Sequence, residues 1–504
     1  MSNFLEWHPS SKKANDLYLI REKISDSLFL DPEKTINLLQ RKWKFGEVSE
    51  VWDDFIFETC IRPVLDRNSK DKIDVAVRRY SVIDHALFST YIRREESPVR
   101  FRRAFWNVNY YGKLISNELS KYVQLVEQSL SRESVDLPSK QKIAFVMKGP
   151  YKLAHVEFLH SFLHGSRIFG QRVEIHLILL DDIHSAPKGI DHVSIVSLSE
   201  VRDPFKKIQA YIDYCVKIKF DHICWVACVQ NLSMYMGMQL AETQSYWSMK
   251  YHSIIMPSIQ KYAGLGFGGE SFYFDDTKWF RGRAFPDLQM PHQDPMLVAR
   301  LRHSVGVPQD ALLVGCFVRA EKLHDKGFWD SVIAILKSSS SVHFAIASQS
   351  IPSKYVSILK SLPSSLSDRF HALGWIDTKN WAFALDIYFD SSPRGSCNTI
   401  FEAIEADVPV LLADSMHNRE SSALPYLASA ANALKSSSNI PGVFDNEAVR
   451  LNACLDLLLK SDNRAKLAFE QKKLLRSLQG QQHLFAKDYL NFFLDQNFQL
   501  SSLQ

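Results

Sequence analysis

The sequence lacks the features that mark membrane proteins or disulfide-stabilised proteins. No apolar run approaches the roughly 20 residues that a helix needs to span a bilayer. The N-terminus, MSNFLEWHPSSKK, has no basic segment followed by an apolar one, so no secretion signal is expected. The seven cysteines form no CxxC pair and lie mostly in apolar runs, which favours reduced, buried thiols. We therefore expect a cytoplasmic protein without a membrane span.

Motifs for several classes of enzyme are missing as well. The net charge of +4 is too small to favour binding to nucleic acid, and 23% charged residues is ordinary for a globular protein. There is no Walker A loop, no Gly-x-Ser-x-Gly elbow and no HExxH pair. No Asp-x-Asp follows a strand, and the adjacent pairs Asp181-Asp182 and Asp275-Asp276 point their side chains in different directions. We therefore expect no metal site of that carboxylate type.

Two alternating patterns of strands and helices dominate the remainder of the chain. After a helical region (1–138), the first pattern has strands at 143–147, 173–180, 193–198 and 223–228, with helices at 153–169 and 208–218. An irregular stretch follows over 229–295. The second pattern has strands at 312–318, 342–348, 370–374, 387–389 and 408–412, with helices at 328–336 and 353–362. Such alternation indicates parallel α/β sheets. The domains that we predict are 1–138, 139–300, 301–445 and a helical end at 446–504.

The most informative stretch, 386–414, reads DIYFDSSPRGSCNTIFEAIEADVPVLLAD. A short buried strand leads into a loop of small residues that includes Gly395, and then into a helix that Ser396 or Asn398 can cap. The free N–H groups and the dipole of a helix N-terminus bind anions. Thr399 and Glu402 are three residues apart and share one face of the helix. The pattern predicts that the loop holds phosphate and that Glu402 accepts hydrogen bonds from ribose hydroxyls.

The segment SCNTIFEAIEADVPVLL resembles the donor site of GT-B glycosyltransferases. In that superfamily a small-residue loop holds the diphosphate of a nucleotide sugar, and an acidic residue, here matched by Glu402, holds the ribose. Retaining enzymes carry a second Glu eight positions earlier, where this chain has Arg394. The pair Asn398-Thr399 is similar to the branch of O-GlcNAc transferases and cytoplasmic bacterial N-glycosyltransferases. The alternative is an ordinary strand–helix crossover whose Gly and Ser only make a turn.

Three cations and a Gly-Trp pair add to the resemblance. Arg319, Lys322 and Lys326 follow the first strand of the second pattern. Cations there can stabilise the charge of a leaving diphosphate without a metal ion. The resemblance matches Arg319 and Lys326 to the GT-B diphosphate grip, with Lys322 as the rival, and a solvated basic loop is the alternative. Gly374-Trp375 corresponds to a loop that contacts the nucleobase, where Trp375 can stack on the base or pack between domains.

The segment 240–252 is partly similar to an acceptor-side segment of the O-GlcNAc-transferase branch. Leu240, Ala241 and Gln244 match, whereas the turn that follows is replaced and His252 is displaced. The resemblance implies Gln244, Lys250 and Tyr251 on the acceptor side and His252 and Lys326 as catalytic residues. Histidine suits proton transfer near pH 7, although a lone histidine is more often structural.

These observations together predict a GT-B architecture: two Rossmann-like, doubly wound domains that face a cleft, with an all-α N-terminal region. The expected activity is metal-independent transfer of a sugar from a nucleotide donor, UDP-linked in our expectation, to a protein or glycan acceptor. No cofactor beyond this co-substrate is expected. An epimerase of the same fold, or a non-catalytic binding protein, is the alternative. The sequence names neither the sugar nor the acceptor.

Overall fold

A computed structural model describes the greater part of the chain from residue 140 onward. The described residues are 73–74, 77, 116–117, 119–129, 140–147, 156–181, 190–226, 233–247, 258–266, 270–274, 277–284, 287–415, 418–419, 422–433, 440–478 and 481–497. The helical region predicted over 1–138 lies almost wholly outside them. In the described residues, no helix combines the length and the apolar character that crossing a membrane requires.

The first unit is built on an eight-stranded sheet with the order β3-β2-β1-β4-β5-β6-β8-β7. All neighbouring pairs are parallel except β7 and β8. Helices α7 and α8 connect strands, and α8 begins at Pro204 because Asp203 accepts a hydrogen bond from the Lys206 N–H. The elements are β1 (Gln141–Met147), α7 (Val156–Ser166), a 3-10 turn (Arg167–Phe169), β2 (Val173–Leu179), β3 (Val193–Ser197), α8 (Pro204–Ile218), β4 (Phe220–Val226), α9 (Ser233–Gly237), β5 (Ala241–Trp247), β6 (Lys261–Gly266), β7 (Glu270–Phe274) and β8 (Thr277–Arg283).

The prediction that residues 229–295 are irregular is wrong. This stretch contains α9 and four strands, β5 to β8, that widen the first sheet. Strand β5, AETQSYW, buries polar Gln244 and Ser245 among its apolar neighbours, so its sequence shows no continuous apolar run. Strands β7 and β8 pair antiparallel with only two residues between them in the sequence, a spacing typical of a β-hairpin.

The second unit is a six-stranded, all-parallel sheet with the order β11-β10-β9-β12-β13-β14. Counted along the chain this order is 3-2-1-4-5-6, which is the order of the Rossmann fold. Both patterns of strands and helices predicted from the sequence are therefore confirmed as Rossmann-like units. The elements are α10 (Pro295–Ser304), β9 (Leu312–Phe317), α11 (Lys326–Ser338), β10 (Val342–Ala347), α12 (Ser353–Ser361), α13 (Ser364–Ser367), β11 (Phe370–Ala372), α14 (Thr378–Ala382), β12 (Ile387–Phe389), α15 (Asn398–Glu405), β13 (Val410–Ala413), α17 (Leu424–Ala433), β14 (Val443–Phe444), α18 (Glu447–Leu459) and α19 (Ser461–Leu478).

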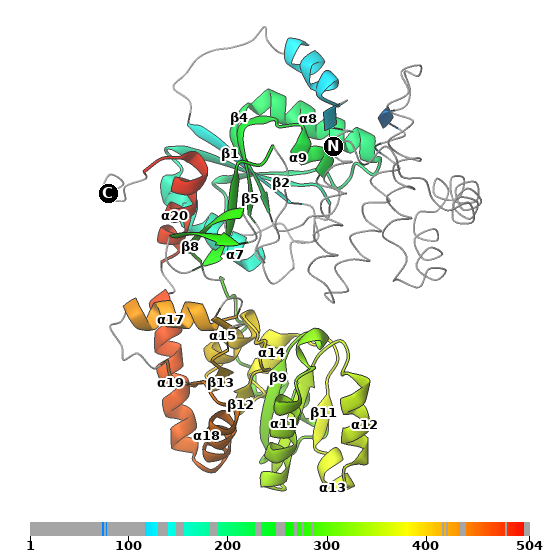
Figure 1. The fold of residues 1–504 in the computed structure, drawn as a ribbon, viewed down its shortest axis with the longest axis vertical. Coiled ribbons are helices and arrows are strands. Elements are labelled where there is room, and N and C mark those ends of the chain that lie inside the picture. The colour runs from blue at the N-terminus through cyan, green and yellow to red at the C-terminus, as the bar shows by residue number, and fades with distance from the viewer. Residues whose placement is uncertain are drawn as a thin grey trace, which may run out of the picture.

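The last helix, α20 (Gln482–Leu494), returns to the first unit, whereas α18 and α19 stay with the second (Figure 1). Helix α20 packs on α7 so closely that a Cβ on Gly165 would lie 2.0 Å from the Gln482 carbonyl oxygen. Tyr489 of α20 stacks on Trp247 of β5 with ring centroids 4.7 Å apart. The chain therefore passes between the units twice, before α10 and after α19.

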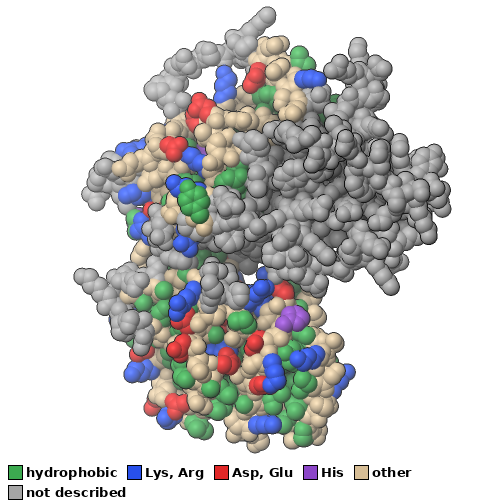
Figure 2. Space-filling view, in the orientation of Figure 1, with side chains coloured by type: hydrophobic (Ala, Val, Ile, Leu, Met, Phe, Trp, Pro, Cys, Tyr) green, Lys and Arg blue, Asp and Glu red, His purple; other side chains and the backbone are tan. Residues whose placement is uncertain are grey.

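The two units meet through the carboxyl-terminal side of the second sheet. Figure 1 shows α14, α15 and α17 at the end of the second unit that faces the first. Phe158 of α7 contacts Tyr426 of α17 with ring centroids 5.9 Å apart. On the face that Figure 2 shows, basic and acidic side chains of the second unit are interspersed. Because α15 lies at the end of the second unit that faces the first, the loop before α15 lies where the units meet.

Candidate functional site

The candidate site lies where β9 and β12 are neighbours at the centre of the second sheet. The strand order reverses at this point, and ligands of such folds bind outside the carboxyl ends of the strands there. The main-chain carbonyl of Phe317, the last residue of β9, accepts hydrogen bonds from the hydroxyls of Ser396 (3.2 Å), Thr399 (3.1 Å) and Tyr388 (3.0 Å). These bonds fix the 390–397 loop and the start of α15 to the end of β9.

Side chains from within and beyond the 390–397 loop hold its backbone. The buried carboxylate of Asp390 accepts from the Ser396 N–H at 3.0 Å, and Asn418 Oδ1 accepts from the Gly395 N–H at 2.5 Å. A Cβ on Gly395 would lie 2.2 Å from Asp390 Oδ2, so only glycine fits there. Burial raises the pKa of Asp390 to about 6, although nearby Lys322 opposes the shift. The loop is thus preorganised before any ligand enters.

The prediction that Ser396 or Asn398 caps the helix is wrong. Helix α15 begins at Asn398, and the residue before it, Cys397, makes no side-chain capping bond. Ser396 donates its hydroxyl to Phe317 instead, and Asn398 Nδ2 donates to Glu157 Oε2 at 2.8 Å. The first turn of α15 also contains no acidic residue. Its N-terminus therefore presents a positive dipole end without a side-chain cap, which suits an anion.

The structure separates the three cations named from the sequence. Lys322 Nζ donates to the carbonyl oxygen of Gly395 in the loop. Arg319 is 54% exposed and pairs with Glu321 at 2.8 Å, and Lys326 is 75% exposed and pairs with Asp330 at 2.6 Å. Burial lowers the pKa of Lys322, and the neighbouring Asp390 opposes that shift. In the described residues it is Lys322 that contacts the loop, whereas Lys326 is the exposed first residue of α11.

Glu402 is the buried acid of the site. Its side chain is 5% exposed and lies among Thr378, Lys379 and Glu157. Burial raises the pKa of Glu402 to about 7, while a hydrogen bond from Thr378 acts in the opposite direction. Its Oε2 atom has no hydrogen-bond partner in the part of the chain that the structure describes. Because burying an unsatisfied acceptor is costly, this oxygen indicates a missing hydrogen-bond donor.

Glu157 is a site residue that the sequence reading missed. It lies in the first turn of α7 and pairs with Lys379 of α14 at 2.8 Å, while also accepting from Asn398 of α15. It therefore ties the first unit to α15, which carries Glu402, and to the neighbouring α14. Its place just after a buried strand and at the start of a helix is the signal that was available, but its partners lie more than 200 residues away in the sequence.

The other predicted site residues are distributed differently. Gly374 adopts a left-handed φ of +67° after β11, and Trp375 beside it is 80% exposed, so Trp375 does not pack between the units. Gln244 is completely buried inside the first unit, where main-chain and side-chain partners occupy its amide. Lys250, Tyr251 and His252 lie outside the described residues. The structure thus brings together Lys322, Gly395, Ser396, Asn398, Thr399 and Glu402.

Comparison with known proteins supports the fold. No family model and no curated protein sequence matches the chain. The structure of an O-GlcNAc transferase mutant from Thermobaculum terrenum covers 97% of this chain and 99% of its own, with 13% identity and a TM-score of 0.53. The chain has the GT-B fold. This confirms the architecture predicted from the 386–414 stretch and the two alternating patterns.

Two further solved structures are similar to a smaller share of the chain. A glycosyltransferase from Rickettsia africae covers 71% of this chain and 98% of its own, with 14% identity and a TM-score of 0.48. The Anabaena HepE protein in complex with UDP and glucose covers 71% of this chain and all of its own, with 14% identity and a TM-score of 0.46. At such identities the likeness concerns the fold alone.

Proposed function

We propose that this GT-B protein is a glycosyltransferase that moves a sugar from a UDP-sugar to a protein or glycan acceptor without a metal ion. One observation carries the proposal: Glu402 is a buried carboxylate whose Oε2 has no hydrogen-bond partner among the described residues, and it lies on α15, whose uncapped N-terminus follows the loop that Lys322 contacts. An anion site and a hydroxyl acceptor about one helical turn apart match a diphosphate joined to a ribose.

Lys322 and the start of α15 form the phosphate side of the proposed site. As the bond between the sugar and the diphosphate breaks, its electron pair stays with UDP, and negative charge grows on the leaving oxygen. A fixed ammonium group and helix N–H groups stabilise that charge without reorganising. The proposal therefore assigns the main cation to Lys322, which contacts the loop, and not to Lys326, whose ammonium pairs with Asp330.

Glu402 forms the ribose side of the proposed site. Its Oε2, which has no partner in the part of the chain that the structure describes, accepts from a ribose hydroxyl, and a bond to a charged acceptor is worth about 1.5–3 kcal/mol. The acceptor's hydroxyl or amide attacks the anomeric carbon and passes its proton to a base. We assign that base to His252, in the segment that the sequence places on the acceptor side.

A panel of ligands tests the proposal directly. The full chain is titrated calorimetrically and by thermal shift with uridine, UMP, UDP and UDP-sugars. We expect UDP and at least one UDP-sugar to bind more tightly than uridine and, at 100 times the dissociation constant, to add about 2.7 kcal/mol to the free energy of unfolding. If neither UDP nor any UDP-sugar bound, the result would favour a non-catalytic GT-B protein. Conversion of a UDP-sugar to its epimer without an acceptor would identify an epimerase.

A further inference from the structure

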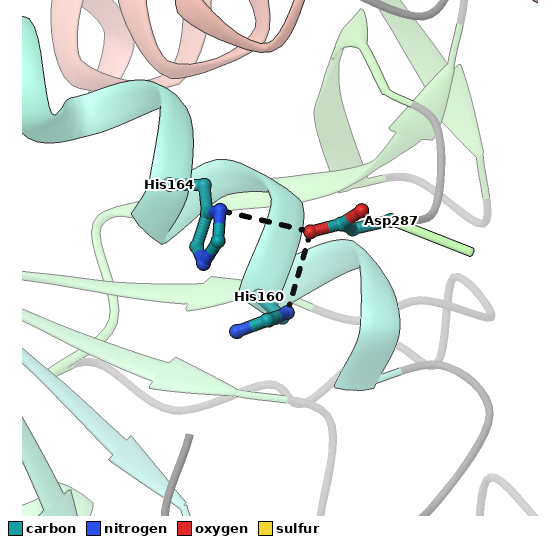
Figure 3. Close-up of side chains that lie close together, drawn as sticks. All are labelled: His160, His164 and Asp287. Carbon is teal, nitrogen blue, oxygen red and sulfur yellow. Dashed lines mark ion pairs between the residues drawn. The ribbon is translucent and has the colours of Figure 1, made fainter. Parts of the chain in front are cut away.

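A second polar cluster lies on the side of α7, apart from the residues of the 390–397 loop. His160 and His164 are four residues apart on α7 and so share one face of the helix. Asp287 faces them from the segment 287–294, which joins the first unit to α10 of the second. Figure 3 shows both imidazoles directing one nitrogen at the same carboxylate oxygen. We call these three residues the linker cluster.

The distances within the linker cluster fit ligands of one ion better than hydrogen bonds. Asp287 Oδ2 lies 3.5 Å from His160 Nδ1 and 3.7 Å from His164 Nδ1. Both separations exceed the 2.7–3.2 Å range of N–H···O hydrogen bonds. Two ligands of a tetrahedral zinc ion, each bonded at about 2.1 Å, lie roughly 3.4 Å apart. All three candidate ligand atoms lie within 4.8 Å of one another, and no other such trio was found in the described residues.

The carboxylate of the linker cluster is also oriented as a metal ligand usually is. Gln289 Nε2 donates to Asp287 Oδ1 at 2.8 Å, which leaves Oδ2 directed at the histidines. Ligating carboxylates commonly receive such an outer hydrogen bond, which fixes their orientation. The Asp287 N–H donates in addition to the Glu157 carbonyl oxygen at 3.3 Å, so the backbone of the segment is already attached to α7. The cluster is thus built before an ion arrives.

We propose that His160, His164 and Asp287 bind a zinc ion that fastens the connecting segment to α7. Two imidazoles and one carboxylate are a donor set that zinc accepts, with water in the fourth position. The zinc ion has a structural role and takes no part in the proposed transfer reaction. Its site lies next to the contacts between the units, because Glu157 is one helical turn before His160 and pairs with Lys379, whose Nζ also donates to the Gln289 carbonyl oxygen.

Metal binding to the full chain tests the proposal. The protein is stripped with a chelator, and zinc is titrated in competition with a chelating dye, with cobalt absorption reporting the coordination geometry. We expect one tight ion per chain in a tetrahedral environment. His160→Ala and His164→Ala should each weaken binding by more than the roughly 10- to 100-fold that loss of an outer hydrogen-bond partner costs, and Gln289→Ala by about that amount.

Matched variants separate this site from adventitious binding and from misfolding. His292→Ala removes an exposed histidine from the same segment and should bind zinc as the unaltered chain does. Alanine favours helix, so the α7 variants should keep the far-ultraviolet circular dichroism of the parent. Zinc should raise the melting temperature of the parent and not that of the doubly substituted His160→Ala/His164→Ala chain. Equal zinc affinity in the parent and this double variant overturns the proposal and leaves an ion pair only.

Discussion

Gln244 in the first unit and Glu402 in the second are both buried, but their polar atoms are satisfied in different ways. In the first unit Gln244 lies within a strand, and its amide donates to the carbonyls of Met236 (2.9 Å) and Ser258 (3.0 Å) and accepts from Trp225 Nε1 (3.0 Å). In the second unit Glu402 lies at the end of the sheet, and its Oε2 has no hydrogen-bond partner among the described residues. A buried polar group with every bond made stabilises the fold. Glu402 lies at the end of the sheet where ligands of this fold bind, so its missing bond supports the proposal that a ligand donates to it.

The largest effect on stability should come from Gln244→Ala. Three buried groups would lose their partner, and each unsatisfied group costs about 1–3 kcal/mol, so the free energy of unfolding should fall by at least about 3 kcal/mol. Thermal and urea unfolding would measure the loss, and UDP affinity of the folded protein should not change. If the variant kept its stability and lost acceptor use, Gln244 would belong to the acceptor side, as its sequence context suggested.

A pair of lysine variants should show which of the two candidate cations, Lys322 or Lys326, binds the diphosphate. Lys322→Ala removes the ammonium group that contacts the loop, and a charge-assisted bond is worth about 1.5–3 kcal/mol, so UDP affinity should fall by up to about a hundredfold. Uridine, which has no phosphate, should bind nearly unchanged. Both are measured by calorimetry.

Lys326→Ala is the matched control for Lys322→Ala. It removes an exposed lysine from the same segment, and its ion pair with Asp330 lies at the surface, where such pairs contribute little. UDP affinity should stay within about twofold. If Lys326→Ala lost more UDP affinity than Lys322→Ala, the diphosphate would be bound by Lys326, as the resemblance implied.

Glu402→Ala should lower UDP affinity by roughly tenfold to a hundredfold, because the acceptor for the ribose is lost. The melting temperature without ligand should hold or rise, since the substitution removes an acid whose Oε2 lacks a hydrogen-bond partner within the described ranges. This is the reverse of the result expected for Gln244→Ala. A lower melting temperature with unchanged UDP affinity would make Glu402 a scaffold residue like Gln244.

The same contrast explains what could be predicted from the sequence. Strands β9, β10 and β12 are short apolar runs bounded by turn residues, so their positions in the sequence and the loop after β12 follow from pattern alone. Strand β5 could not be found in this way, because Gln244 and Ser245 are satisfied only by tertiary partners. A polar residue inside a strand reads as a loop until its partners are known.

Long-range pairing accounts for the remaining misses in the site. Lys322 and Lys326 are four residues apart in one basic stretch, and only the fold shows which of them contacts the loop. Glu157 and the linker cluster likewise depend on α7 meeting segments more than 100 residues away. The i, i+4 spacing of His160 and His164 was visible, but the third residue, Asp287, was not.

UDP affinity should depend on pH through Glu402. The pKa of Glu402 is raised to about 7 by burial, so the acid is largely protonated at pH 6 and ionised at pH 8. If the carboxylate is the form that accepts from ribose, affinity should rise about tenfold from pH 6 to pH 8. Glu402→Gln should remove that part of the dependence, which is measured as the difference between the two proteins. An identical pH profile for both would contradict the assignment.

The stability of the ligand-free protein should respond in the opposite sense. An acid whose pKa is raised from 4.5 in the unfolded chain to about 7 in the folded one keeps a proton that the unfolded chain has released. Folding through this group therefore becomes less favourable as pH rises from about 4.5 to about 7, and constant above that range. Glu402→Gln should gain stability relative to the parent over the same interval. Asp390, raised to about 6, is present in both proteins and cancels.

The smallest effect should be that of a chelator on turnover. Lys322 and the α15 N-terminus supply positive charge at the loop, and the loop's own carboxylate, Asp390, is engaged by the Ser396 N–H. A metal ion would duplicate a charge that is already fixed in place. UDP release from a bound UDP-sugar should therefore change by less than about twofold in EDTA.

The His160→Ala/His164→Ala chain should behave in the same way. If EDTA abolished turnover in both proteins and manganese restored it, the result would contradict a metal-free donor site, because the variant has no linker-cluster ion to lose. If EDTA lowered turnover in the parent alone, the effect would come from the linker-cluster ion and the positioning of the two units. The chemistry at Lys322 would then still need no metal.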